Sequence, residues 1–477
     1  MPARWPTLML LTLATLSTLG SCSRNPGNGE AVGQPDELAR LATDPDQLDR
    51  TTAIALALQL DPADQRRPAV IERLRRDGPP GLDALIDEYR STPGRDVAED
   101  AAWTALIDEV AQQRDAQWGG LFWYRDLAQA RTAAASSGKP ILSLRMLGEL
   151  TSEYSCANSR LFRTLLYADP QLAQWLEDNF VLHWSSERPV PKLEIDFGDG
   201  RKIARTITGN SAHFVLDEQG RTIDVVPGQM AASSFQTALL DSLALHRELA
   251  GVRNDGRWRK HVAAHHERRF EANATRLADS LAQIRGLPQD TPAVRAWLAR
   301  SPNPTQEPVP AIEAVPMAIG KSKIERPILA KSPRRAVDRE APRASAWTAP
   351  DELELWMLGS RIAGAVALHP NSEAIIASEH PLDLLVAPER REEAAVAMRQ
   401  ALIRSIQADT GKNVLELHAR VHLELAARAR DDRSLGFADV DAWLYAELFE
   451  TPASDPWLGL VDPSVYTGLE AGGVIEP

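Results

Sequence analysis

Residues 139–160 read KPILSLRMLGELTSEYSCANSR, and this stretch decides the fold of the region around it. Lys139 and Pro140 end an amphipathic pattern, and the apolar run 141–147 has the length of a buried strand. After a polar loop, Cys156 opens a second helical pattern. Since a helix, a strand and a helix follow one another here, we expect a sheet covered by helices.

The same alternation continues on both sides of this stretch, over residues 116–250. An amphipathic helix precedes the first strand, and another strand follows the helix that Cys156 opens. Two further strands flank Glu218-Gln219-Gly220, which predicts a hairpin with glycine at the turn. The expected elements are a helix over 123–136, strands over 141–147, 180–184, 213–217 and 222–226, and a last helix over 232–249.

These pieces together resemble the thioredoxin-like superfamily, particularly its exported members. The resemblance covers residues 118–250. It implies a thioredoxin-like α/β domain over 116–250. The matching pieces are Lys139-Pro140 before the strand, a cysteine at the start of the next helix, Asn179-Phe180-Val181, and the hairpin from Leu216-Asp217 to Gly220 that ends in Pro227-Gly228.

Two departures from that family concern its chemistry. Redox-active members carry Cys-x-x-Cys, whereas this chain has Cys156-x-x-Ser159. Without a resolving thiol, one site cannot run a dithiol/disulfide cycle. Where those members place a cis-proline before the hairpin strand, this chain has Asn210-Ser211-Ala212. The resemblance therefore implies the fold without conventional oxidoreductase activity.

Cys156 leaves two functions open. A thiol at a helix N-terminus meets free backbone N–H groups and the positive end of the helix dipole, and both favour the thiolate. Ser159 and Arg160 would shape this end of the helix, so a monothiol exchange protein with Cys156 as nucleophile is one interpretation. The other, which we favour, is a buried cysteine in a domain that serves as a scaffold or protein-binding module.

The N-terminus has the layout of an export signal. Arg4 precedes an apolar stretch, 8–19, that is too short to span a bilayer. The following Leu19-Gly20-Ser21-Cys22 resembles the bacterial lipobox, which implies a signal peptide over 1–21 and a lipid such as palmitate on Cys22. Ser23, rather than an aspartate, follows the cysteine, and the resemblance to Gram-negative sorting signals implies the outer membrane rather than the inner one. We expect a lipoprotein anchored to the cell envelope and facing the periplasm.

The net charge and the number of cysteines limit which partners and which disulfides the protein can have. The net charge of −13 over 477 residues argues against nucleic acid. Cys22 and Cys156 are the only cysteines, so a lipid on the first leaves no intramolecular disulfide. We expect the membrane, through the lipid, and a protein or envelope component as partners, and no bound cofactor.

The remaining regions read as helices and connecting segments, so the fold class is α+β, with a thioredoxin-like domain between all-helical regions. Gly, Pro, Asn and Ser are frequent in the tether, and the linker holds nine prolines. The expected regions are a lipidated tether over 22–35, a HEAT-like or bundle domain over 36–115, a helical extension over 251–300, a linker over 301–350 and a C-terminal helical domain over 351–477.

His418 and His422 form a candidate metal site. They stand four residues apart in a predicted helix, so their imidazoles project from one face one turn apart. Such a pair can chelate Zn²⁺ or another transition metal when Glu416 or Glu424 supplies a third ligand.

A second histidine group, His261 and His265, repeats this spacing beside His266-Glu267. Neither pair belongs to a His-Glu-x-x-His motif, which argues against a metalloprotease. The sequence also contains no Walker loop, dinucleotide fingerprint or nucleophile elbow. Histidines four residues apart in a helix also arise often by chance in a chain with ten of them, and this alternative stays open.

Overall fold

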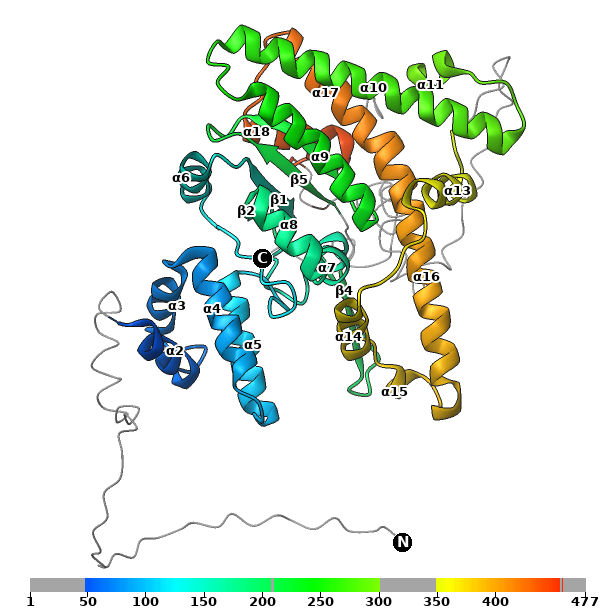
Figure 1. Cartoon of the computed structure of the whole chain (residues 1–477). Helices are drawn as coiled ribbons and strands as arrows, with labels where there is room; N and C mark the ends of the chain where they lie inside the picture. Colours follow the sequence, from blue (N-terminus) through cyan, green and yellow to red (C-terminus); the bar gives the residue numbers. More distant parts are fainter. Residues whose placement is uncertain (1–47, 207–209, 301–348, 455–456, 458–477) are drawn as a thin grey trace, which may run out of the picture.

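The computed structural model describes residues 48–206, 210–300, 349–454 and 457 (Figure 1). Within them the protein is a mixed α+β structure, mostly helical, with a four-stranded mixed sheet and a separate two-stranded hairpin. The predicted signal peptide, Cys22, the tether and almost all of the linker lie outside the described residues. None of the described helices is both long enough and apolar enough to cross a bilayer.

The central sheet has the strand order β2-β1-β5-β6. β1 runs parallel to β2, antiparallel pairing joins β1 to β5 and β5 to β6, and Ile141 lies opposite both Val181 and Leu216. Every residue of β5 and β6 is buried. The four predicted strands are confirmed, with small shifts of their ends. They are β1 (Ile141–Met146), β2 (Val181–Ser186), β5 (Ser211–Leu216) and β6 (Thr222–Pro227).

The hairpin of β3 (Lys192–Asp196) and β4 (Lys202–Thr206) escaped the sequence analysis. Its residues alternate between half-buried and exposed along β3, so it lacks the continuous apolar run of the central strands. The two strands pair antiparallel, with Lys192 opposite Thr206.

Helices cover the sheet, and the first of them begins later than the pattern predicted. The predicted start at Trp123 is wrong because Tyr124 pairs with β2 instead: its N–H donates to the Leu182 carbonyl over 2.9 Å, and it accepts from the Trp184 N–H over 3.1 Å. Asp126 then caps the helix. The covering elements are α6 (Leu127–Ser137), α7 (Ala157–Phe162), the π-helical turn η2 (Arg163–Tyr167), α8 (Pro170–Asn179) and α9 (Ala232–Leu249).

Four N-terminal helices pack around a core of their own (Figure 1). Arg67 is buried among them and donates to the Glu109 carboxylate over 2.9 Å and to the Leu60 carbonyl over 2.9 Å. These bonds satisfy a charge that would otherwise be costly to bury. The helices are α2 (Arg50–Gln59), α3 (Arg67–Arg75), α4 (Gly78–Ser91) and α5 (Val97–Ala111).

Helices of the C-terminal half of the chain pack against the central sheet. α16, η5 and α17 follow one another without a break over residues 391–430 and form a long rod beside α13 and α10 (Figure 1). Side chains of α17, α18 and η6 belong to the same hydrophobic core as the strands. The elements are α10 (Asp255–Arg285), α11 (Thr291–Leu298), α13 (Glu352–Ala363), α14 (Pro370–Glu379), α15 (Leu382–Leu385), η4 (Pro388–Arg390), α16 (Arg391–Lys412), η5 (Asn413–Leu417), α17 (His418–Arg430), α18 (Phe437–Trp443) and η6 (Leu444–Leu448).

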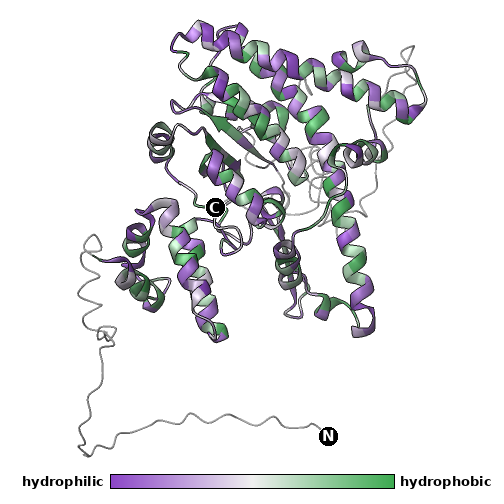
Figure 2. Cartoon of the chain, viewed as in Figure 1, coloured by the Kyte–Doolittle hydropathy of each residue, from purple (hydrophilic) through white to green (hydrophobic). Residues whose placement is uncertain are grey.

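Colouring by hydropathy separates these layers (Figure 2). The central strands are mostly hydrophobic, whereas the surrounding helices mix hydrophobic and hydrophilic residues. This is the distribution expected when each helix buries one face against the sheet and leaves another in solvent.

Two glycines allow α13 and α16 to cross at close range. A Cβ added to Gly359 would lie 1.6 Å from the Gln407 carbonyl oxygen, and one added to Gly411 would lie 2.3 Å from that of Leu355. No side chain fits at these distances, so the backbones touch directly.

We therefore predict that Gly359→Ala lowers the free energy of unfolding by about 1–3 kcal/mol or more, because the two helices must separate to admit the methyl group. Gly256→Ala in α10 is the control, since its Cβ would meet the Asn254 side chain at an ordinary 3.5 Å. Urea denaturation of both variants checks this. Equal stability of the two would contradict the close crossing.

Candidate functional site

Cys156 precedes the first residue of α7 as its N-cap, as the sequence predicted, but its side chain is fully buried. Its thiol donates to the Ser159 hydroxyl oxygen over 3.3 Å. The same hydroxyl donates to the Cys156 carbonyl over 2.8 Å. Ser159 therefore lies at the thiol, and the two side chains form a closed pair away from solvent.

The C-terminal segment closes this region of the molecule. Tyr445 and Phe449 share the hydrophobic core with Cys156. The Tyr445 hydroxyl donates to the Asn210 carbonyl over 3.3 Å, and the Asn210 amide donates to the Thr451 hydroxyl over 3.2 Å. Burial, with the charge of Asp441 next in size, raises the pKa of Tyr445 well above its usual value. A reagent can reach the Cys156 thiol only if the segments of the chain packed around it move apart.

Arg160 does not complete a cluster with the thiol and Ser159. Its guanidinium donates to the Thr206 hydroxyl at the end of β4 over 3.0 Å. Thr206 in turn donates to the Ser155 carbonyl over 3.5 Å. Arg160 therefore attaches the β3-β4 hairpin to α7, and Thr206 attaches it to the loop before this helix.

Arg145 joins the sheet to the C-terminal helices. Its guanidinium donates to the Asp441 carboxylate over 2.8 Å and to the Ser186 carbonyl over 2.6 Å, and it also pairs with Glu187. Burial raises the pKa of Asp441 to about 7, against the attraction of Arg145. This group was not predicted from the sequence, although an arginine inside the apolar run 141–147 was a signal for it.

His213 is a buried histidine on β5. Its Nε2 lies 2.5 Å from the Tyr167 hydroxyl, and its ring packs between those of Phe162 and Phe235 with centroids 4.6 and 4.7 Å away. Burial lowers the pKa of His213 to about 3. The ring is therefore neutral at physiological pH and serves as a hydrogen-bonding core residue.

A second polar group lies where β6, α10 and α17 meet, and we name it the histidine-aspartate cluster: Asp224, His266, His418 and His422. All four side chains are buried. His418 Nε2 lies 3.1 Å from Asp224 Oδ1, and His266 Nδ1 lies 2.9 Å from His422 Nδ1. Three elements far apart in sequence thus bring their ionisable groups together.

Hydrogen bonds orient the members of this cluster. The Ser242 hydroxyl donates to Asp224 Oδ2 over 2.8 Å. Burial alone would raise the pKa of Asp224, but its histidine neighbours, His418 first, hold it well below its usual value. His266 Nε2 lies 2.8 Å from the Ile223 carbonyl, which can only accept, so this nitrogen carries the proton.

The predicted pair, His418 and His422, comes together, with ring centroids 4.1 Å apart. Its neighbours are nevertheless Asp224 and His266, which the sequence analysis did not join to it. His261 is exposed on α10. The two glutamates considered as third ligands form ion pairs along their own helical segment instead, Glu416 with Arg420 and Glu424 with Arg428.

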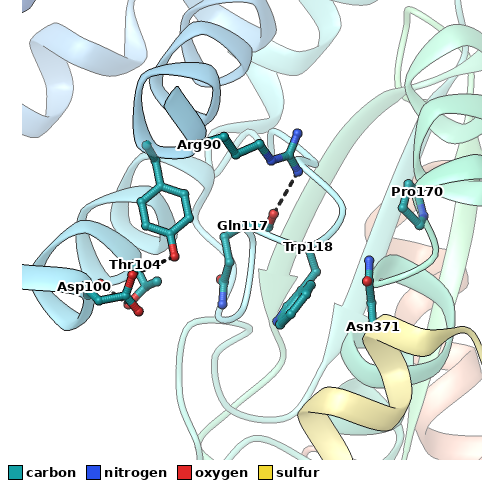
Figure 3. A pocket seen from close by; sticks show the side chains of 8 residues that line it. Arg90, Asp100, Thr104, Gln117, Trp118, Pro170 and Asn371 are labelled. Carbon is teal, nitrogen blue, oxygen red and sulfur yellow. Dashed lines mark hydrogen bonds between the residues drawn. The ribbon is translucent and has the colours of Figure 1, made fainter. Parts of the chain in front are cut away.

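A pocket of about 450 Å³ opens between the N-terminal helices and the sheet region (Figure 3). The Arg90 guanidinium donates to the Gln117 carbonyl over 3.1 Å at one side. Trp118 stands between this pair and Asn371 of α14. The lining residues are Tyr89, Arg90, Asp100, Thr104, Gln117, Trp118, Pro170 and Asn371.

Comparison of the chain with protein-family models, with curated proteins and with solved structures gives no match.

The buried His213 predicts a pH dependence of stability. In the unfolded chain His213 becomes protonated below about pH 6.5, whereas in the folded protein it stays neutral until about pH 3. The free energy of unfolding should therefore fall as pH drops through this window, by roughly 1.4 kcal/mol per pH unit for this residue. His213→Gln keeps a hydrogen-bonding partner for Tyr167 but does not titrate.

Urea unfolding at pH 6.5 and pH 5 measures the effect. The variant should lose less stability between these pH values than the wild type. Identical losses would show that His213 binds its proton equally well in the folded and unfolded chain.

Proposed function

We propose that this protein is a lipid-anchored lipoprotein of the cell envelope whose thioredoxin-like domain acts as a scaffold or protein-binding module. The observation that carries the proposal is the burial and hydrogen bonding of the Cys156 side chain. Its side chain has no exposed surface, and its S–H donates to Ser159. Reactive cysteines lie in partly exposed, electropositive surroundings, whereas buried ones are inert.

The sheet supports the thioredoxin-like part of the proposal. A parallel β1-β2 pair joins an antiparallel β5-β6 hairpin through β1 and β5, and the cysteine caps the helix that follows β1. This mixed sheet, with the cysteine at the start of the following helix, supports the proposal of a thioredoxin-like domain. Helices α8 and α9 follow in the expected places, before β2 and after β6.

The anchor rests on the residues before the described region. The apolar stretch 8–19, the small residues after it and Cys22 form the lipobox-like signal. A lipid there would tether the folded body through residues 22–35 to the periplasmic side of a membrane, with the outer membrane favoured by Ser23.

The alternative, a monothiol exchange protein, needs a thiol that a partner can attack. Attack on a disulfide requires the sulfur to approach another sulfur directly. In the described structure Cys156 has no exposed surface and lies close enough to Tyr445 to act on its pKa, so such attack would require the surrounding chain to open. The two functions therefore differ in the accessibility of the Cys156 thiol in the folded protein, which can be measured.

We predict that Cys156 in the full chain reacts with a maleimide only after unfolding. Cys22→Ser provides a protein in which Cys156 is the sole thiol. Labelling followed by mass spectrometry at pH 6 and pH 8 should show an unmodified folded protein and complete modification in denaturant.

Tyr445→Ala serves as a positive control, because removing the buried ring should open the cover and speed labelling. Rapid labelling of the folded Cys22→Ser protein at pH 6 would instead establish an exposed thiolate and support monothiol exchange.

The pocket beside Trp118 is a suitable surface for a protein partner. It combines an aromatic ring with Arg90 and Asp100, and aromatic and arginine side chains dominate binding hot spots. It also lies where the N-terminal helices, the sheet region and α14 meet, so a bound partner would contact all three.

We predict that a photoactivatable amino acid at position 118 forms a discrete adduct in cells, whereas one at position 97 does not. Val97 is 89% exposed at the start of α5, outside the pocket lining, which makes it a matched control. Immunoblotting after irradiation reads out the adducts. Adducts of equal yield at both positions, or none at 118, would contradict binding in this pocket.

A further inference from the structure

The histidine-aspartate cluster plays no part in the scaffold function proposed above. Asp224, His266 and His422 each offer a ligand atom, and these three atoms all lie within 4.8 Å of one another. Within the described ranges, no other three histidine, cysteine, aspartate or glutamate side chains come together in this way. Two imidazoles and one carboxylate are ligands that Zn²⁺ and related transition metals accept.

The spacing of the ligand atoms suits one metal ion. His266 Nδ1 lies 2.9 Å from His422 Nδ1, and His422 Nδ1 lies 3.9 Å from Asp224 Oδ1. A metal bound at about 2.0–2.2 Å to each ligand holds neighbouring ligand atoms roughly 3 to 3.5 Å apart. These two distances lie a few tenths of an ångström on either side of this range, so small shifts of these atoms would bring both pairs into it.

Further contacts already orient the ligands. His266 donates its Nε2 proton to the Ile223 carbonyl, so its Nδ1 presents a lone pair toward His422. His418 Nε2 and the Ser242 hydroxyl hold the two oxygens of Asp224. Metal-binding histidines almost always donate their other ring N–H to a carbonyl or carboxylate, and ligating carboxylates are hydrogen-bonded in turn.

We propose that Asp224, His266 and His422 supply three of the ligands of a divalent transition metal of the Zn²⁺ type in a structural role. The ion would bond to Asp224 Oδ1 and to the Nδ1 atoms of the two neutral imidazoles. The Nδ1 proton of His422 would move to its Nε2 as the bond forms. The three residues are 0–2% exposed, so no substrate reaches them. The metal joins β6 to α10 and α17.

Metal uptake by the full chain in detergent tests this site. The protein carries an affinity tag without histidine, is stripped with EDTA, and is titrated with Co²⁺ and then with Zn²⁺. We expect stoichiometric Co²⁺ with visible d–d absorption, its displacement by Zn²⁺, and a higher thermal midpoint with Zn²⁺ than with Mg²⁺.

Variants locate the ion. His266→Gln and Asp224→Asn should lose at least a hundredfold in Co²⁺ affinity. His418→Gln removes a positioning residue, and its affinity should fall 10- to 100-fold. His261→Gln is the control, because it changes an exposed histidine of the same helix and should bind as the wild type does.

The wild-type titration stands even if a ligand variant fails to fold. Folded wild-type protein that takes up no Co²⁺ and gains no stability from Zn²⁺ would show a hydrogen-bonded histidine cluster without metal. Equal losses in His261→Gln and His266→Gln would place the metal elsewhere. Either result overturns the site.

Discussion

A carboxylate buried in the last strand of the sheet constrains how the C-terminal half of the chain can pack. Asp224 is 1% exposed, and its partners are Ser242 of α9 and His418 of α17. An uncompensated charge in such a place costs several kcal/mol. Helices that follow β6 must therefore place polar side chains next to Asp224. The chain between residues 224 and 418 has to be long enough to bring α17 back to the sheet.

The same return closes the cysteine region. After α17 the chain turns into α18, where Asp441 meets Arg145 of β1, and η6, where Tyr445 contacts Asn210. The sheet, the cysteine and these helices consequently share one hydrophobic core. Exposure of the thiol is thus coupled to a segment almost 300 residues further along the chain. A reaction at Cys156 would disturb the packing that holds the C-terminal helices in place.

Local patterns in the sequence predicted the elements well and their partners poorly. The apolar runs gave the four strands, and Cys156 stands at the helix start that the sequence indicated. The β3-β4 hairpin was not predicted because its strands are short, only partly buried and without a continuous apolar run. The pairing of His422 with Asp224 and His266 could not be read from spacing, because it depends on three elements meeting in space. An aspartate within an apolar strand was the available signal.

A five-residue π-helical turn between α16 and α17 determines the direction in which His418 and His422 of α17 point. η5 (Asn413–Leu417) ends immediately before His418. One extra residue in a helical turn rotates the following helix by roughly 100° relative to the preceding one. The turn is fixed from outside: Asn413 donates to the Gln229 carbonyl and lies against Gly228, where an added Cβ would come within 2.5 Å of the amide. Gly228 has φ +67°, so its conformation and its missing side chain both suit glycine. The glycine after β6 thus contributes to the orientation of α17 toward Asp224, which lies four residues earlier, on β6.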